Sequence, residues 1–124
     1  MAIDYGRKRM GLASSDDESK FAFALESLTF EKFDRIYSAL LTKIAELNPE
    51  KIIIGVPLGF DLKPTQMSLE IEAFITKLTS DISTEIIRWN EVGTSKIAQQ
   101  NLRTSGKKDI DSESARIILQ EYLD

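Results

Sequence analysis

The chain has 124 residues, a formal net charge of −4, and neither cysteine nor histidine. This length can bury one sizeable core but not two, so we expect a single domain over residues 1–124. The missing residue types exclude Ser-His-Asp triads, thiolate nucleophiles and metal sites ligated by histidine or thiolate. Any catalysis must therefore use carboxylates, Lys, Tyr, Ser or Thr, or a metal held by oxygen ligands. Carboxylates alone select hard cations such as Mg²⁺ or Mn²⁺.

Location and charge narrow the choice of partners. No apolar run approaches the roughly 20 residues of a membrane span, and the opening Met1-Ala2-Ile3-Asp4 reaches a carboxylate too early for a signal peptide. We expect a cytoplasmic protein that does not bind membranes. The acidic net charge argues against tight nonspecific binding of nucleic acid. Two basic clusters, Arg7-Lys8-Arg9 and Arg103 with Lys107-Lys108, are each typical of a solvated turn when taken alone.

The first 28 residues predict three antiparallel strands. A short apolar stretch ends at Asp4, which leaves little length for a central strand and raises the question whether residues precede Met1. Met10, Leu12 and Ser14 then alternate with small residues, as a half-buried strand does. A turn is expected over 15–19 and a third strand over 21–28.

The pattern then changes to alternating helices and strands. Apolar residues at three- and four-residue steps predict a helix that ends at Asn48-Pro49. The β-branched run 51–56 is typical of a parallel strand buried on both faces. A helix around Ile71 to Leu78, a strand over 85–89, and helices over about 94–103 and 111–122 follow, the last two separated by a polar loop.

This element order predicts the fold class. It combines an antiparallel meander with right-handed crossovers. It matches the α/β architecture of RNase H-like domains, in which a five-stranded mixed sheet has the order 3-2-1-4-5 and helices cover both faces.

Three acidic residues fall at the ends of expected elements, where sites on α/β sheets usually form. Asp4 closes the first strand, Glu91 closes the fifth and Asp111 opens the last helix. Converging carboxylates repel one another without a cation. One or two divalent metals relieve that repulsion and activate water for phosphodiester hydrolysis. The positions therefore favour a metal site.

Each acid also has a structural interpretation. An aspartate at the start of a helix is commonly an N-cap, which would account for Asp111. Glu91 is compatible with a solvated strand end and Asp4 with a turn. Asp61 and the pair Asp16-Asp17 are expected to be turn residues. Spacing alone leaves both interpretations open.

Three motifs in matching order resemble one known family. The opening Asp4-Tyr5-Gly6-Arg7-Lys8-Arg9-Met10-Gly11 resembles the first motif of the YqgF family, RuvC-related proteins described both as resolvases and as pre-16S rRNA nucleases. The segment Ile53-Ile54-Gly55-Val56-Pro57-Leu58 is similar to that family's Val-Val-Gly-Leu-Pro-Leu. The ending from Asp111 to Leu123 is similar to its closing helix. The resemblance covers essentially the whole chain.

The resemblance implies an RNase H-like fold and a metal-dependent nuclease. Asp4, Glu91 and Asp111 stand at the family's acidic positions, so it implies that they are the catalytic residues and the ligands of Mg²⁺ or Mn²⁺. Two segments depart from the pattern. Asn90-Glu91-Val92 stands where the family has Asp-Glu-Arg, and Gly59-Phe60-Asp61-Leu62 where it has Asn-x-Asp-Gly. Both departures touch the expected substrate side.

The expected function is nuclease processing of the 5′ end of pre-16S rRNA. A Holliday junction resolvase needs paired active sites and a broad cationic surface. This chain offers only Arg7-Lys8-Arg9 and Lys107-Lys108 to hold phosphates near the acids. Structured or precursor rRNA is therefore expected as the partner rather than branched DNA, with a monomer or weak homodimer. Alternatives left open are a resolvase-like DNA endonuclease, a non-catalytic RNA-binding ribosome assembly factor, and a nucleotide-binding half-domain of the sugar-kinase and actin class.

Overall fold

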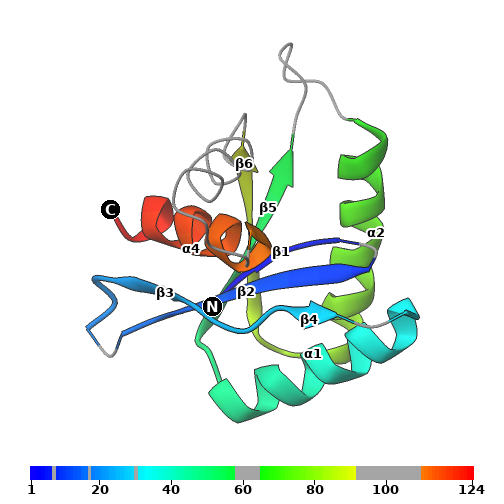
Figure 1. Ribbon diagram of the computed structural model, residues 1–124, viewed down its shortest axis with the longest axis horizontal. Coiled ribbons are helices and arrows are strands. Elements are labelled where there is room, and N and C mark those ends of the chain that lie inside the picture. Colours follow the sequence, from blue (N-terminus) through cyan, green and yellow to red (C-terminus); the bar gives the residue numbers. More distant parts are fainter. Residues whose placement is uncertain (7, 17, 30, 58–64, 92–109) are drawn as a thin grey trace.

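A mixed β-sheet lies between two helices on one side and one on the other in the computed structural model of the chain (Figure 1). The structure describes residues 1–6, 8–16, 18–29, 31–57, 65–91 and 110–124, with the backbone alone at Glu91, Ile110 and Asp111. No helix in these ranges is long and apolar enough to cross a membrane.

The three-residue strand β1 lies at the centre of the sheet. The strands follow one another in the order β3-β2-β1-β5-β6, and β4 also pairs with β2. β1 pairs antiparallel with β2 and parallel with β5, which is parallel to β6. The predicted order 3-2-1-4-5 is therefore confirmed. The bounds are β1 Ala2–Asp4, β2 Arg9–Ser15, β3 Ala22–Ala24, β4 Leu28–Thr29, β5 Lys51–Pro57 and β6 Glu85–Glu91.

The prediction of a single strand over 21–28 is wrong. The structure divides this segment into β3 and β4, and both pair with β2. The residues between them are not in strand conformation. The register of this segment against β2 changes by one residue between β3 and β4.

Three helices are described: α1 Phe33–Leu47, α2 Gln66–Asp81 and α4 Ile110–Leu123. Asn48 ends α1 in the left-handed region at φ 45°, and its N–H bonds to the carbonyl of Ile44. Thr65 begins α2 with a capping box shared with Ser68. The predicted helix over 94–103 lies outside the described residues.

Side-chain alternation divides the core into two layers. On one face of the sheet, Ile3, Leu12 and Ile54 pack against α1 and α2 in the larger cluster. On the other face, Ala2, Ala13 and Ile53 pack against Ala115, Ile118 and Leu119 of α4. β5 contributes to both layers, as its continuous β-branched run predicts. Helices on both faces are thus confirmed, and alanines form much of the surface beneath α4.

Candidate active-site edge

The carboxyl ends of the three parallel strands lie at one edge of the sheet. Asp4 is the last residue of β1, and Glu91 ends β6 opposite Pro57, the last residue of β5. Ile3 pairs with Ile54, and Ile54 with Arg88, so Glu91 lies two residues farther along its strand than the level of Asp4. From strand spacing and rise, the two Cα atoms are about 12 Å apart. In open α/β sheets, ligands bind at such an edge.

Asp4 lies on the face of the sheet that α4 covers. Ala2, two residues earlier in β1, belongs to the α4 layer, and side chains alternate along a strand. Tyr5 turns the other way: its ring lies 5.9 Å from that of Phe33 and 5.0 Å from that of Phe74, on the α1–α2 side. This aromatic anchor fixes the strand end, while Asp4 stays half-buried.

Gly6 makes the turn after Asp4 possible. A Cβ atom at this position would lie 2.1 Å from the carbonyl oxygen of Arg9. Only glycine can approach the backbone of β2 so closely. The glycine of the Asp-x-Gly motif is therefore required for steric reasons. The tight turn that it permits brings Lys8 and Arg9 back beside the end of β1.

The first turn of α4 lies next to the cross-strand pair that Asp4 of β1 forms with Gly11 of β2. Gly11 pairs with Asp4 across β1 and β2, and the neighbouring Leu12 N–H donates to Ser112 Oγ at 3.2 Å. Ser112 Oγ also lies 2.9 Å from Ser27 Oγ. Asp111 precedes Ser112 and is the second residue of α4, so it lies within the first turn and not before it. The N-cap interpretation of Asp111 does not fit these helix bounds.

A further acid of this turn is already engaged. Glu113 accepts from both Nη2 and Nε of Arg116, at 2.5 and 3.0 Å. This hydrogen bonding raises the pKa of Arg116 above its usual value. The pair neutralises one carboxylate in the first turn of α4.

The structure describes only part of the set predicted from the sequence. Among side chains it describes, no three acids lie close enough to hold a metal; the side chains of Glu91 and Asp111 are outside that description. Lys8 and Arg9 are exposed, and with Thr29 and Glu31 they line an open depression of about 560 Å³. The other predicted residues, Arg7, Lys107, Lys108 and Asp61, lie outside the described residues.

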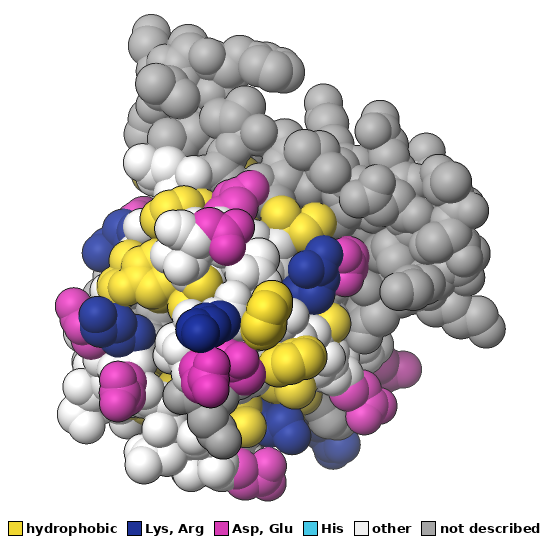
Figure 2. Space-filling model, turned by 90° about the vertical axis from the view of Figure 1, so that its left-hand side faces the viewer, with side chains coloured by type: hydrophobic (Ala, Val, Ile, Leu, Met, Phe, Trp, Pro, Cys, Tyr) yellow, Lys and Arg dark blue, Asp and Glu magenta, His cyan; other side chains and the backbone are white. Residues whose placement is uncertain are grey.

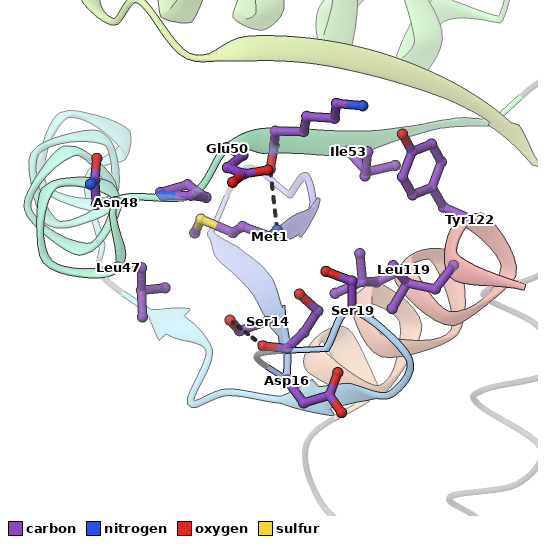
Figure 3. A pocket seen from close by; sticks show the side chains of 14 residues that line it. Met1, Ser14, Asp16, Ser19, Leu47, Asn48, Glu50, Ile53, Leu119 and Tyr122 are labelled. Carbon is purple, nitrogen blue, oxygen red and sulfur yellow. Dashed lines mark hydrogen bonds between the residues drawn. The ribbon is translucent and has the colours of Figure 1, made fainter.

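Asp16 behaves as predicted for a turn residue. Its Oδ1 accepts from the backbone N–H groups of Lys20 and Phe21, at 2.7 and 3.2 Å. It also lines a cavity of about 460 Å³ at the opposite end of the sheet, where β1 and β5 begin (Figure 3). Met1, Ile53 and Leu119 contribute apolar side chains to this cavity. Its place at the amino ends of the parallel strands separates it from the acidic edge.

Two hydroxyl residues, Ser27 and Ser112, were not anticipated from the sequence. Neither belongs to a recognisable catalytic motif, and serines in turns and first helical turns usually make local backbone contacts. The available signal was weak: Ser112 and Ser114 are polar residues in a helix whose inward face is otherwise apolar, and both are buried.

The sheet order, the central position of β1 and the helices on both faces define an RNase H-like α/β fold. The Fowlpox virus resolvase, solved in complex with substrate Holliday junction DNA, shares this fold, with a TM-score of 0.52 at 17% identity over 98% of this chain and 95% of that one. The sequence profile described as "RuvX: Holliday junction resolvase" matches residues 1–124. The chain therefore belongs to the RuvX family, which confirms the predicted YqgF relationship.

Relatives described as "putative pre-16S rRNA nuclease" cover the whole chain. The protein of Chlorobium phaeobacteroides is 38% identical over 135 residues, which is all of this chain and 90% of that protein. That of Mycoplasmopsis synoviae is 34% identical over all of this chain and 96% of that protein. That of Maridesulfovibrio salexigens is 33% identical over 99% of this chain and 96% of that protein.

Proposed function

We propose that residues 1–124 form one metal-dependent nuclease domain that hydrolyses phosphodiester bonds at the 5′ end of pre-16S rRNA. The observation that carries the proposal is the position of Asp4, which ends the central strand on the α4 face. The backbone of β6 ends at Glu91 on the same edge, and the first turn of α4 carries Asp111 beside the neighbouring strand. The three acidic residues are the proposed catalytic set.

The donor set fits a hard divalent cation. All three residues supply carboxylate oxygens, and the chain contains neither histidine nor cysteine to favour a softer metal. Asp4, Glu91 and Asp111 would hold one or two such ions. Mg²⁺ or Mn²⁺ bound there would supply an activated water and charge stabilisation of the leaving oxygen. The role of the protein is to hold the carboxylates and the phosphate in place.

Lys8 and Arg9 are proposed to hold the substrate phosphates. Both are exposed at the amino end of β2, two to three residues from Gly11, the partner of Asp4. Cationic side chains this close to Asp4 along β2 can bind phosphates on either side of one scissile bond. Arg7, Lys107 and Lys108 are proposed to extend this contact from the flanking segments.

The decisive comparison is Asp4→Asn against Asp16→Asn. Both aspartates are half-buried, but Asp16 lies in the turn at the other end of β2, and an asparagine there keeps the Oδ1 acceptor. With precursor 16S rRNA and Mg²⁺ or Mn²⁺, we expect Asp4→Asn to lose cleavage and to fold normally, and Asp16→Asn to cleave like the wild type. A fully active Asp4→Asn would refute the mechanism. An inactive Asp4→Asn that fails to fold would instead support a structural role.

A second candidate is a resolvase-like DNA endonuclease, because the fold is shared with a resolvase solved on junction DNA. The charge distribution favours RNA. On the described face that carries α4 and β3, Lys and Arg side chains are dispersed among Asp and Glu side chains (Figure 2). Four duplex arms require a broader cationic surface. Cleavage of a four-way junction and of precursor rRNA at equal salt, with the solution mass, distinguishes the two. A stable dimer that nicks junctions symmetrically and leaves RNA intact would reverse the choice.

A non-catalytic assembly factor remains the alternative that the departures Asn90 and Val92 favour. Such a factor would bind precursor rRNA without cutting it. The same cleavage assay separates this role from the nuclease, since RNA bound but uncut by the wild type in the presence of either metal would support the assembly factor.

A further inference from the structure

The chain between β3 and β4 carries one residue more than the strand it faces. Ala24 pairs with Ala13, and Leu28 with Met10, so the three residues 25–27 lie opposite the two residues 11–12. One extra residue of this kind is a β-bulge, which bends a strand and redirects its side chains. The bulge divides the expected single strand into β3 and β4, and it includes Ser27.

The bulge frees one backbone donor of β2 from the strand ladder. The carbonyl of Leu12 accepts from the Leu25 N–H at 2.8 Å, as in a regular ladder. The Leu12 N–H, however, donates to Ser112 Oγ of α4. Ser112 is wholly buried, and its hydroxyl is within hydrogen-bond distance of Ser27 in the bulge. We name Ser27 and Ser112, with this donor, the hydroxyl clasp.

The hydroxyl clasp lies one residue from the row that contains Asp4. Gly11, adjacent to Leu12, pairs with Asp4 and has no side chain to hold α4 away from the sheet. Ser112 directly follows Asp111. The clasp thus joins the part of α4 that carries one proposed metal ligand to the strand beside another.

The described apolar side chains of α4 pack against the sheet mainly beyond its first turn. Among the described side chains of α4, Ala115 is the first apolar one in the core layer, and the larger Ile118 and Leu119 follow a turn later. Apolar contacts are non-directional and let a helix slide over an alanine surface. Hydrogen bonds are directional, so the clasp sets the position of the first turn.

We propose that Ser27 and Ser112 are positioning residues that set Asp111 relative to Asp4 for metal binding. This inference rests on the proposed function. Mutating residues that hold metal ligands in position typically lowers metal affinity or activity ten- to a hundredfold. A displacement of about 1 Å in a reacting group can lower a rate about a hundredfold. Losing a clasp hydroxyl therefore acts on metal affinity and not only on folding.

The test measures Mn²⁺ affinity of the full chain, from free Mn²⁺ by electron paramagnetic resonance, without substrate. Ser112→Ala and Ser27→Ala should each weaken Mn²⁺ binding about tenfold. Ser27→Thr retains the hydroxyl and should recover most of the affinity lost in Ser27→Ala. The matched control is Ile118→Val, which loosens α4 without touching the clasp and should bind Mn²⁺ as the wild type does. If Ser112→Ala does not fold, the comparison of Ser27→Ala with Ser27→Thr tests the same inference.

A double-mutant comparison distinguishes positioning from general destabilisation. If Ser112 acts through Asp111, then Ser112→Ala in an Asp111→Asn background should weaken Mn²⁺ binding no further. Full additivity, or unchanged affinity in both serine variants while Asp4→Asn abolishes binding, would overturn the inference and leave the proposed function intact. Wild-type chain that binds no Mn²⁺, or binds it independently of Asp4, would instead overturn the proposed function together with the inference.

Discussion

Ile118→Ala tests how α4 is held on the sheet. Ile118 is wholly buried, and its layer includes Ala2, Ala13, Ala115 and the larger Ile53. Truncating a buried isoleucine to alanine costs about 2–5 kcal/mol, more where the neighbours cannot close over the cavity. Alanines have no side-chain freedom with which to fill it. We therefore expect a loss near the upper half of that range, about 4 kcal/mol.

The measurement is urea unfolding followed by circular dichroism, with the midpoint and the slope fitted separately. For a domain of this size the loss corresponds to a fall of about 15 °C in Tm. The control is Ile71→Ala on the other face, where Met67 and Phe74 are large neighbours that can shift toward the cavity. We expect about 3 kcal/mol there. A loss below about 1 kcal/mol for Ile118→Ala would show that this layer does not hold α4.

Three further predictions concern capping, pH and salt. Thr65→Ala removes the acceptor of the Ser68 N–H and should cost about 1 kcal/mol in urea unfolding, whereas Thr65→Ser should cost little. Burial, and then the hydrogen bond to Asp81, raise the pKa of Tyr37 above its ordinary value of about 10. Its contribution to stability is therefore present below about pH 10 and is lost as pH rises through the folded value, so Tyr37→Phe should flatten the alkaline fall in unfolding free energy measured across pH 9–11. Lys8→Gln and Arg9→Gln should each reduce the slope of log RNA affinity against log salt by about one, and an unchanged slope would contradict phosphate contact.

Elements with a strong local period could be predicted from the sequence. The run at 51–56 became β5, and the apolar residues at three- and four-residue steps became α1, which ends at Leu47, just before the predicted stop at Asn48-Pro49. Burial on both faces left no polar–apolar alternation in β5, yet its run of β-branched residues was sufficient to predict the strand. The strand order followed from the element order, because crossovers between parallel strands have one hand.

The division of the third strand could not be predicted, because its cause is distant in the sequence. Gln120 of α4 accepts from the Ala22 N–H at 2.9 Å and donates to the carbonyl of Lys20, so an amide side chain pairs with the outer edge of β3. The bulge that follows is bonded to Ser112. Both contacts span 85 residues or more. The local sequence pattern over 21–28 does not reveal contacts this distant, so the segment resembled one continuous strand.

The sequence predicted which element carries each proposed acidic residue, but not how far apart these residues lie. Chain order correctly placed Asp4 and Glu91 at strand ends and Asp111 in the first turn of α4. It did not give the register, which sets Glu91 two residues beyond the level of Asp4. Convergence of the three carboxylates stays a prediction, since it depends on distances between elements that no local pattern contains.

Small residues on the α4 face connect the fold to the proposed chemistry. Ala2, Gly11 and Ala13 lie beneath or beside α4, where a larger side chain would lift the helix from the sheet. A proposed ligand on α4 can reach one on β1 only if helix and sheet approach closely. The alanines make that approach possible but leave the helix free to slide, and the buried hydroxyl of Ser112 removes that freedom through a directional bond to Leu12. Close approach and fixed register therefore have separate physical causes here, and a carboxylate site shared between β1 and α4 requires both.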